Sequence, residues 1–423
     1  MAHHFNNSAY GRLVDRLNRF PQGAPASDVL FDILKMLFTE KEAGLVAQLP
    51  IKPFDVKKAA GVWKLSETEA RKILDELASR AILLDMEIMG KQMYCLPPPM
   101  AGFFEFSMMR VRRDIDQKAL SELFHQYINV EEDFIRELFA VGDTGLGRIF
   151  VQEPMIGEEY ELQVLDYERA THVIDTASHI GVSMCYCRHK MQHMGKACDA
   201  PMDICMTFNT SARSLIKYGH AREVSREECR DLLQQAYEHG LVQFGENNRE
   251  GVNFICNCCG CCCEALLAVK RFAMVKTIHS NFIVDLEPSD CIGCGRCVRA
   301  CPVDVLSLPD RESLAPGERG RPEIKEDMCL GCGVCVRTCP THSLKLVPRP
   351  ERMITPLNTS HRAVLMAAER GCLQELIFDN QVLFSHRLMA AVLGAILKLP
   401  PVARNLAQKQ LRSRYIEKLM EKM

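Results

Sequence analysis

The chain has 423 residues, of which 47% are apolar and 25% are charged, and its formal net charge is −2. These are ordinary values for a globular protein, and they exclude a strongly basic protein of the kind that binds nucleic acid or anionic lipid through its net charge. Cysteine is the exception, with 21 residues. Because a long chain that starts without a secretory leader does not use so many cysteines for disulfides, we expect metal binding in a reducing cytoplasm.

We expect an α+β protein of several domains, and residues 1–100 predict the first, a helical domain closed by a hairpin. Capping boxes of the form T-x-x-E and S-x-x-E at residues 39–42 and 66–69 mark the starts of two helices. Residues 81–86 and 92–96 predict two strands. Helices followed by a two-stranded hairpin are typical of a winged-helix-like domain.

The next segment, residues 101–279, predicts a mostly helical, cysteine-rich domain. Amphipathic patterns predict helices at residues 115–127, 130–139 and 167–180. A short strand is expected at residues 181–185, directly after the third helix.

Residues 349–423 predict a helical C-terminal extension. From Ser385 onward it holds eight lysines and arginines against two glutamates, a basic tail that could dock on an acidic partner. The most apolar stretch, residues 388–399, is too short to cross a bilayer, so we expect no transmembrane segment.

The strongest motif is C-x-x-C-x-x-C-x-x-x-C-P, which occurs from Cys291 to Pro302 and again from Cys329 to Pro340. Three cysteines at this spacing can hold three corners of an iron–sulfur cubane, which takes four thiolates. The intervening glycines let backbone amides approach the sulfurs. Zinc can be held by C-x-x-C pairs, but it has no use for eight cysteines in this pattern.

This double motif resembles the bacterial 2[4Fe–4S] ferredoxin family over residues 280–348. The resemblance implies a ferredoxin-like βαββαβ domain with two [4Fe–4S] clusters, each taking its fourth ligand from the opposite copy of the motif. One cluster would be held by Cys291, Cys294, Cys297 and Cys339, and the other by Cys329, Cys332, Cys335 and Cys301. An insertion at residues 309–322 separates the two copies.

Ten further clustered cysteines precede this domain, and they form the second cysteine field. They are Cys185, Cys187, Cys198, Cys205, Cys256, Cys258, Cys259, Cys261, Cys262 and Cys263. Six thiols within eight residues do not all bury as plain apolar groups, so a metal or cluster is expected. The first four could hold one cubane, and the last six could hold another or complete the first. One or two additional iron–sulfur clusters, zinc and a redox-active dithiol all stay open.

Basic and histidine side chains accompany this field. Arg188, Lys190 and Lys196 would offset the negative charge of a thiolate-bound cluster, and His189 and His193 are possible substitute ligands. The isolated cysteines, Cys95, Cys229 and Cys372, fit the apolar core instead.

Three segments also resemble those of an uncharacterised family of dicluster ferredoxin-like proteins from anaerobes. They are C-x-C-R-H at residues 185–189, C-D-A-P at 198–201 and I-C-N-C-C-x-C-C-C at 255–263. The resemblance extends over most of the chain and implies iron–sulfur clusters, but it implies no particular reaction.

The sequence predicts an electron-transfer protein or oxidoreductase subunit, because it offers clusters without a dinucleotide or flavin site. Redox partner proteins would then supply and accept the electrons. One alternative is a thiol or disulfide reductase that uses the field from Cys185 to Cys263. Another is a redox-sensing regulator, but the predicted recognition helix, residues 66–80, holds four acidic and three basic residues. Asp85 and Glu87 add acid to the hairpin, whereas DNA-reading elements are basic.

Overall fold

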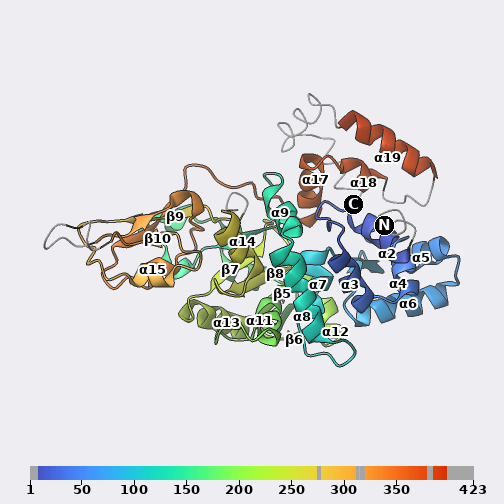
Figure 1. The fold of residues 1–423 in the computed structure, drawn as a ribbon, viewed down its shortest axis with the longest axis horizontal. Coiled ribbons are helices and arrows are strands. Elements are labelled where there is room, and N and C mark those ends of the chain that lie inside the picture. Colours follow the sequence, from blue (N-terminus) through green and yellow to red (C-terminus); the bar gives the residue numbers. More distant parts are fainter. Residues whose placement is uncertain (1–7, 274–277, 311–313, 315–319, 379–383, 398–423) are drawn as a thin grey trace.

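The computed structural model describes residues 8–273, 278–310, 314, 320–378 and 384–397. Helices and small sheets are combined in an α+β arrangement (Figure 1). Along the longest axis, the N-terminal helices lie at one end, a six-stranded sheet lies in the middle, and a segment with two small sheets lies at the other end. No helix in the described part of the chain is long and apolar enough to cross a bilayer.

In the described part of the N-terminal segment, five helices pack against a hairpin. The elements are α2 (Ala9–Leu17), α3 (Asp28–Leu37), α4 (Glu40–Val46), α5 (Val56–Trp63), α6 (Glu67–Ser79), β1 (Leu84–Ile88) and β2 (Lys91–Cys95). Both predicted capping boxes are present: Thr39 accepts from the Glu42 amide, and Ser66 accepts from the Glu69 amide. These caps satisfy amides that the first helical turn leaves free.

The centre of the molecule is an antiparallel sheet in the order β3-β7-β8-β5-β4-β6. Its strands are β3 (Gly147–Phe150), β4 (Ile180–Met184), β5 (Asp203–Phe208), β6 (Arg222–Glu223), β7 (Val242–Glu246) and β8 (Phe254–Cys258). The helices around it are α7 (Phe104–Phe106), α8 (Gln117–His125), α9 (Asp133–Ala140), α10 (Ala170–Thr176), α11 (Tyr186–His193), α12 (Asn209–Lys217), α13 (Arg226–Glu238) and α14 (Glu264–Phe272). Short 3-10 or π-helical turns are η1 (Pro99–Phe103), η2 (Gln126–Val130), η3 (Glu153–Met155), η4 (Glu158–Gln163) and η5 (Asp166–Glu168).

The sheet adds strands to the expected helices: the sequence predicted the strand at residues 181–185, which is β4, but not the rest of the sheet. All five residues of β7 are buried, as are the last five of β5. Strands covered on both faces lack the alternation of apolar and polar residues that identifies a half-exposed strand. Buried polar residues such as Gln243 and Thr207 weaken the apolar signal further.

The described residues between 282 and 348 run in the order strand, helix, strand, strand, helix, strand. The elements are β9 (Phe282–Leu286), α15 (Arg296–Ala300), β10 (Leu306–Ser307), β11 (Glu323–Ile324), α16 (Val334–Arg337) and β12 (Leu344–Pro348), with the 3-10 turn η7 (Glu326–Met328) before α16. β9 pairs with β12 and β10 pairs with β11, both antiparallel. The first and last strands are therefore neighbours, which brings the two cysteine motifs together.

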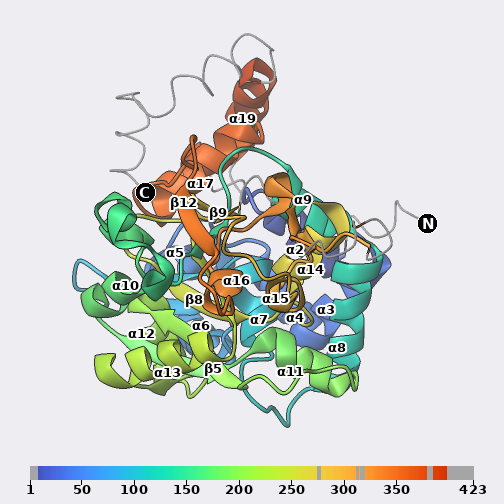
Figure 2. The ribbon, with the colours of Figure 1, turned by 90° about the vertical axis from the view of Figure 1, so that its left-hand side faces the viewer.

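The C-terminal helices are α17 (Thr359–Glu369), α18 (Leu373–Ile377) and α19 (Phe384–Leu397). They lie beside the N-terminal helices (Figures 1 and 2), where Ile51 packs with Val364 and Leu373. Most of the predicted basic tail, from Lys398 onward, lies outside the described residues.

Candidate metal centres

The first centre, here called the outer set, is a cavity of about 320 Å³ in residues 282–348, which carry both cysteine motifs and are called the ferredoxin segment below. Its cysteines are Cys291, Cys294, Cys297 and Cys339. Gly293 and Gly295 both have φ near +67°, which lets the loop between the first three thiols fold back on itself. Cys294 is exposed and Cys297 is buried, so the cavity has one side near solvent.

Cys339 comes from the second motif and reaches the outer set from the end of α16. Burial alone would raise the pKa of its thiol, but hydrogen bonds with Ser343, Thr341 and nearby amides lower that pKa to about 7. The Cys339 sulfur lies 3.2 Å from the Ser343 hydroxyl. A partly ionised thiol is prepared for metal binding, because the thiolate is the form that ligates.

The second centre, the inner set, is a cavity of about 340 Å³. Its cysteines, all buried, are Cys301, Cys329, Cys332 and Cys335. The Val305 and Gly331 amides donate to the sulfurs of Cys301 and Cys329 at 3.4 Å. A Cβ on Gly331 would lie 1.9 Å from the Phe282 carbonyl oxygen, so only glycine fits there.

Each cavity thus takes three thiols from one motif and one from the other. Four thiols around a closed space, with amides aimed at the sulfurs, are the donor set that an iron–sulfur cubane requires. Burial raises the pKa of Cys332 to about 12, so metal binding must displace a proton from this thiol. The residues present in both cavities therefore fit [4Fe–4S] clusters.

The ten cysteines of the second field form two groups in the structure. These groups are not the first four and the last six cysteines of the sequence. Seven of them line a cavity of about 660 Å³. Six belong to the first group, and the space is here called the six-thiol cavity after them: Cys185, Cys187, Cys205, Cys256, Cys258 and Cys263. Cys259, which also lines the cavity, belongs to the second group. Cys198 lies close to Cys259, Cys261 and Cys262 and not with the other early cysteines of the field. The first four cysteines of the field therefore do not surround one common point.

Strands and helix starts bring the six thiols together. Cys256 and Cys258 alternate with Asn257 on β8, so both point to the same face. Because Met206 pairs with Ile255, Cys205 on β5 lies next to Cys256. The remaining three, Cys185, Cys187 and Cys263, come from the N-terminal ends of α11 and α14. The helix dipole there favours a thiolate at the two residues that precede the helices, Cys185 and Cys263.

The thiols of the six-thiol cavity influence each other strongly. The pKa of Cys263 lies well below its usual value, first because of hydrogen bonds from Cys187 and Cys258, and further because of amides in the first turn of α14. Burial is the main reason that the pKa of Glu105, which also lines this cavity, is raised to about 7. Hydrogen bonds with neighbouring thiols, together with burial, place the pKa of the Cys187, Cys205, Cys256 and Cys258 thiols well above the usual value. The cavity therefore combines a readily ionised thiol at Cys263 with thiols and a carboxyl group that resist ionisation.

Among the described residues, two buried cations, Arg188 and Lys190, lie on the helix that borders the cavity, and one of them is already paired with a carboxylate. Arg188 is fully buried and donates to the carbonyl oxygens of Pro201 at 2.8 Å and Asn257 at 2.7 Å. Lys190 forms a buried ion pair with Glu264, so its charge is already compensated. The expectation that Lys190 offsets a cluster is therefore corrected. Lys196 is exposed.

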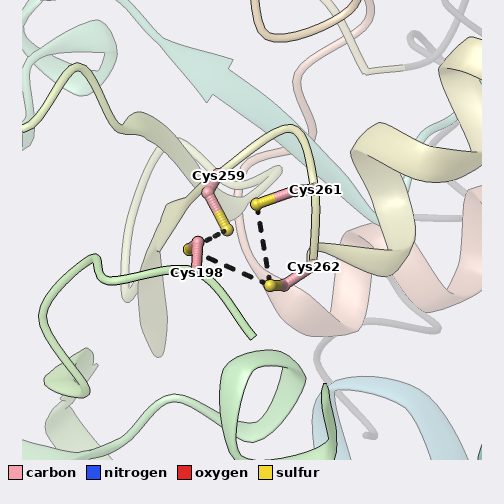
Figure 3. A group of neighbouring side chains, drawn as sticks. All are labelled: Cys198, Cys259, Cys261 and Cys262. Atoms are coloured by element: carbon pink, nitrogen blue, oxygen red, sulfur yellow. Dashed lines mark hydrogen bonds between the residues drawn. The ribbon is translucent and has the colours of Figure 1, made fainter. Parts of the chain in front are cut away.

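The other four thiols of the field form a compact group, here called the thiol quartet (Figure 3). Its members are Cys198, Cys259, Cys261 and Cys262, and all four sulfurs lie within 4.8 Å of one another. Three of them follow β8 in the turn before α14, and Cys198 comes from the loop before β5. Cys262 is buried, whereas Cys261 is exposed.

The turn of the quartet touches the inner set directly. A Cβ on Gly260 would lie 2.1 Å from the carbonyl oxygen of Pro302, the residue after Cys301. Lys270 of α14 also pairs with Asp304 at 2.8 Å. The ferredoxin segment therefore packs on the second field at the point where its inner cavity lies.

Several of these residues could not be found by sequence reasoning. Glu105 lies 80 residues before Cys185, and no motif connects them.

The histidines considered as ligands have other partners: His189 lies 2.7 Å from the Met108 carbonyl oxygen, and its other ring nitrogen lies 3.2 Å from His193. Cys229 is fully buried in the core.

Residues 290–343 match the family model described as a 4Fe-4S dicluster domain. The chain therefore contains an iron–sulfur domain of the ferredoxin type. Comparison with curated proteins gave no match, and neither did comparison with solved structures.

Proposed function

We propose that the protein passes low-potential electrons between partner oxidoreductases, using two [4Fe–4S] clusters in the ferredoxin segment and a further iron–sulfur cluster in the six-thiol cavity. Bound clusters would supply one-electron oxidation and reduction. The observation that carries the proposal is the contact between Gly260 and Pro302, which joins the inner set to the second field. Electron transfer slows steeply with distance, so such direct packing is what a chain of centres needs.

The proposed ligands follow from the cavities. The outer set would hold one cluster and the inner set the other, with Cys339 and Cys301 as the ligands exchanged between motifs. The six thiols of the larger cavity exceed the four that one cubane binds. Either two thiols stay free beside a cubane, or a larger cluster uses all six, and the iron content distinguishes the two.

Burial suggests where a partner docks. Cys294 of the outer set is exposed, and the neighbouring Ile292 is 46% exposed, whereas every thiol of the inner set is buried. A redox partner protein would therefore exchange electrons at the outer set, and the inner set would connect it to the middle of the molecule.

The remaining units are proposed to support this role. The division is residues 1–100, 101–279, 280–348 and 349–423, with the first as a winged-helix-like structural or docking module. Its hairpin lies against α12: Asp85 accepts from the Ser214 hydroxyl at 2.7 Å and pairs with Lys217. A hairpin held in this way, next to an acidic helix, does not favour DNA reading.

The test is a count of iron, acid-labile sulfide and zinc per chain on protein purified without oxygen, followed by a reductive titration monitored by electron paramagnetic resonance. We expect at least twelve irons and twelve sulfides, because three sites would each hold four or more of each. The titration should show at least three reducible centres. About eight of each would confine electron transfer to the ferredoxin segment, and far fewer than eight would overturn the proposal.

A second candidate function is a thiol or disulfide reductase at the six-thiol cavity. The cavity is lined by apolar side chains such as Phe139 and Phe254 as well as by more thiols than one cubane binds. Thiols left over beside a cubane would be available to a small disulfide. The test is whether the reduced protein reduces a small disulfide. Activity that is lost in Cys205→Ser but kept in Cys229→Ala would favour this candidate over an electron carrier.

A further inference from the structure

The thiol quartet has the dimensions of a site for one metal ion. The sulfur of Cys198 lies 3.5 Å from that of Cys259 and 3.9 Å from that of Cys262, and the sulfurs of Cys261 and Cys262 lie 3.7 Å apart (Figure 3). Four thiolates bound tetrahedrally to one zinc at ~2.3 Å lie ~3.8 Å from one another. The three distances fall close to that value.

The same distances do not suit a cubane. In a cubane each thiolate binds a different iron and points outward, so the four sulfurs are spread around the whole cluster. Among the residues that the structure describes, the quartet is the one group of three or more possible ligands whose donor atoms all lie within 4.8 Å. The cysteines of the outer and inner sets form no group this close, although they fit cubanes.

The ligand chemistry favours zinc. All four donors are cysteine sulfurs, and soft thiolates select zinc or iron over magnesium and calcium. Four protein ligands also leave no open position, which is typical of a structural zinc site. Zinc has no redox chemistry, so such a site shapes the fold instead of carrying electrons.

The surroundings show what the site would hold in place. Arg188 donates to the carbonyl oxygens of Pro201 and Asn257, so one buried cation links the loop of Cys198 to the strand that leads to Cys259. Gly260, between two quartet cysteines, contacts Pro302. A metal in the quartet would therefore fix the surface on which the ferredoxin segment packs.

We propose that Cys198, Cys259, Cys261 and Cys262 bind one structural zinc ion, which holds the turn between β8 and α14 in the shape that receives the ferredoxin segment. This goes beyond the proposed electron transfer and does not depend on it, since zinc content and iron content are measured separately.

The test compares zinc, iron and sulfide per chain in the natural protein and in Cys198→Ser and Cys261→Ser. We expect one zinc in the natural protein, its loss in both variants, and unchanged iron and sulfide. Cys229→Ala, a buried thiol outside every set, is the control and should keep all three. Loss of about four irons and four sulfides from the quartet variants would overturn the proposal in favour of a cubane. Loss of one iron without sulfide would overturn the assignment to zinc.

A measurement on the natural protein covers variants that fail to fold. X-ray absorption at the zinc edge should show four sulfur neighbours at ~2.3 Å. Nitrogen or oxygen neighbours, or the absence of zinc from protein with full iron content, would overturn the proposal.

Discussion

Gly260→Ala tests the contact that joins the ferredoxin segment to the second cysteine field. The added Cβ would lie 2.1 Å from the Pro302 carbonyl oxygen and 3.0 Å from the Pro302 Cα. Because these are backbone atoms, no side chain can turn away, and the two segments must separate by about 1 Å to reach an ordinary contact. Overpacking of this kind costs about 1–3 kcal/mol of unfolding free energy.

The assay is thermal unfolding of the metal-loaded protein without oxygen, together with the rate at which an electron leaves the reduced ferredoxin clusters. A cost of 1–3 kcal/mol corresponds to a decrease of roughly 2–12 °C in melting temperature. Electron transfer to the middle of the molecule should be slower, because the centres lie farther apart.

Gly61→Ala is the matched control, because Gly61 lies within α5 and an added Cβ there meets no atom within 4 Å. This variant should gain stability, by roughly 0.5–1 kcal/mol, since alanine is the better helix former. If Gly260→Ala melted at or above the temperature of Gly61→Ala and kept its transfer rate, the close approach to Pro302 would not be a requirement of the fold.

Three further predictions concern the clusters, pH and the C-terminal helices. Cys301→Ser should remove the inner cluster and Cys339→Ser the outer one, each with a loss of about four irons. The two variants should therefore show different electron paramagnetic resonance signals from the cluster that remains. The same signal in both would contradict the assignment of Cys301 to the inner set and Cys339 to the outer set. Burial lowers the pKa of His220 to about 4, below its unfolded value. The unfolding free energy should therefore fall as pH decreases from about 6.5 to 4, by up to about 3 kcal/mol. Urea unfolding at several pH values measures this dependence, and His220→Gln should lack the contribution of His220 to it. Arg362→Leu leaves the buried Glu246 without its cation, so thermal and urea unfolding should show a loss of about 3–5 kcal/mol, and a loss below 1 kcal/mol would rule out a strong pair.

The eight ferredoxin cysteines could be recognised from the sequence because their spacing is local. Three ligands of each set lie within seven residues, and a short motif carries that signal completely. The capping boxes at residues 39–42 and 66–69 were predicted for the same reason: the two partners of each box are three residues apart. Such features depend on one turn of backbone and not on the rest of the fold.

The division of the second field could not be predicted, because it depends on strand register and on distant loops. Cys205 and Cys256 become neighbours only when β5 pairs with β8, 51 residues along the chain. A register shifted by one residue would turn Cys256 and Cys258 to the other face of the sheet. The sheet itself was missed because its inner strands are buried on both faces and lack alternation.

The composition and charge of the six-thiol cavity support the proposal that it binds a metal cluster. A cysteine that serves as a small apolar group packs among apolar side chains, as Cys229 does. In the six-thiol cavity, the cysteine side chains face one shared space instead. Two helix N-termini favour thiolates at Cys185 and Cys263, and the pKa of each of these thiols lies below its usual value. Lys190 is paired with Glu264, and among the described residues that line the cavity Arg188 is the one basic side chain. Two thiolates thus exceed the positive charge at the cavity wall, and under the proposed function bound iron would balance that charge and supply the redox chemistry.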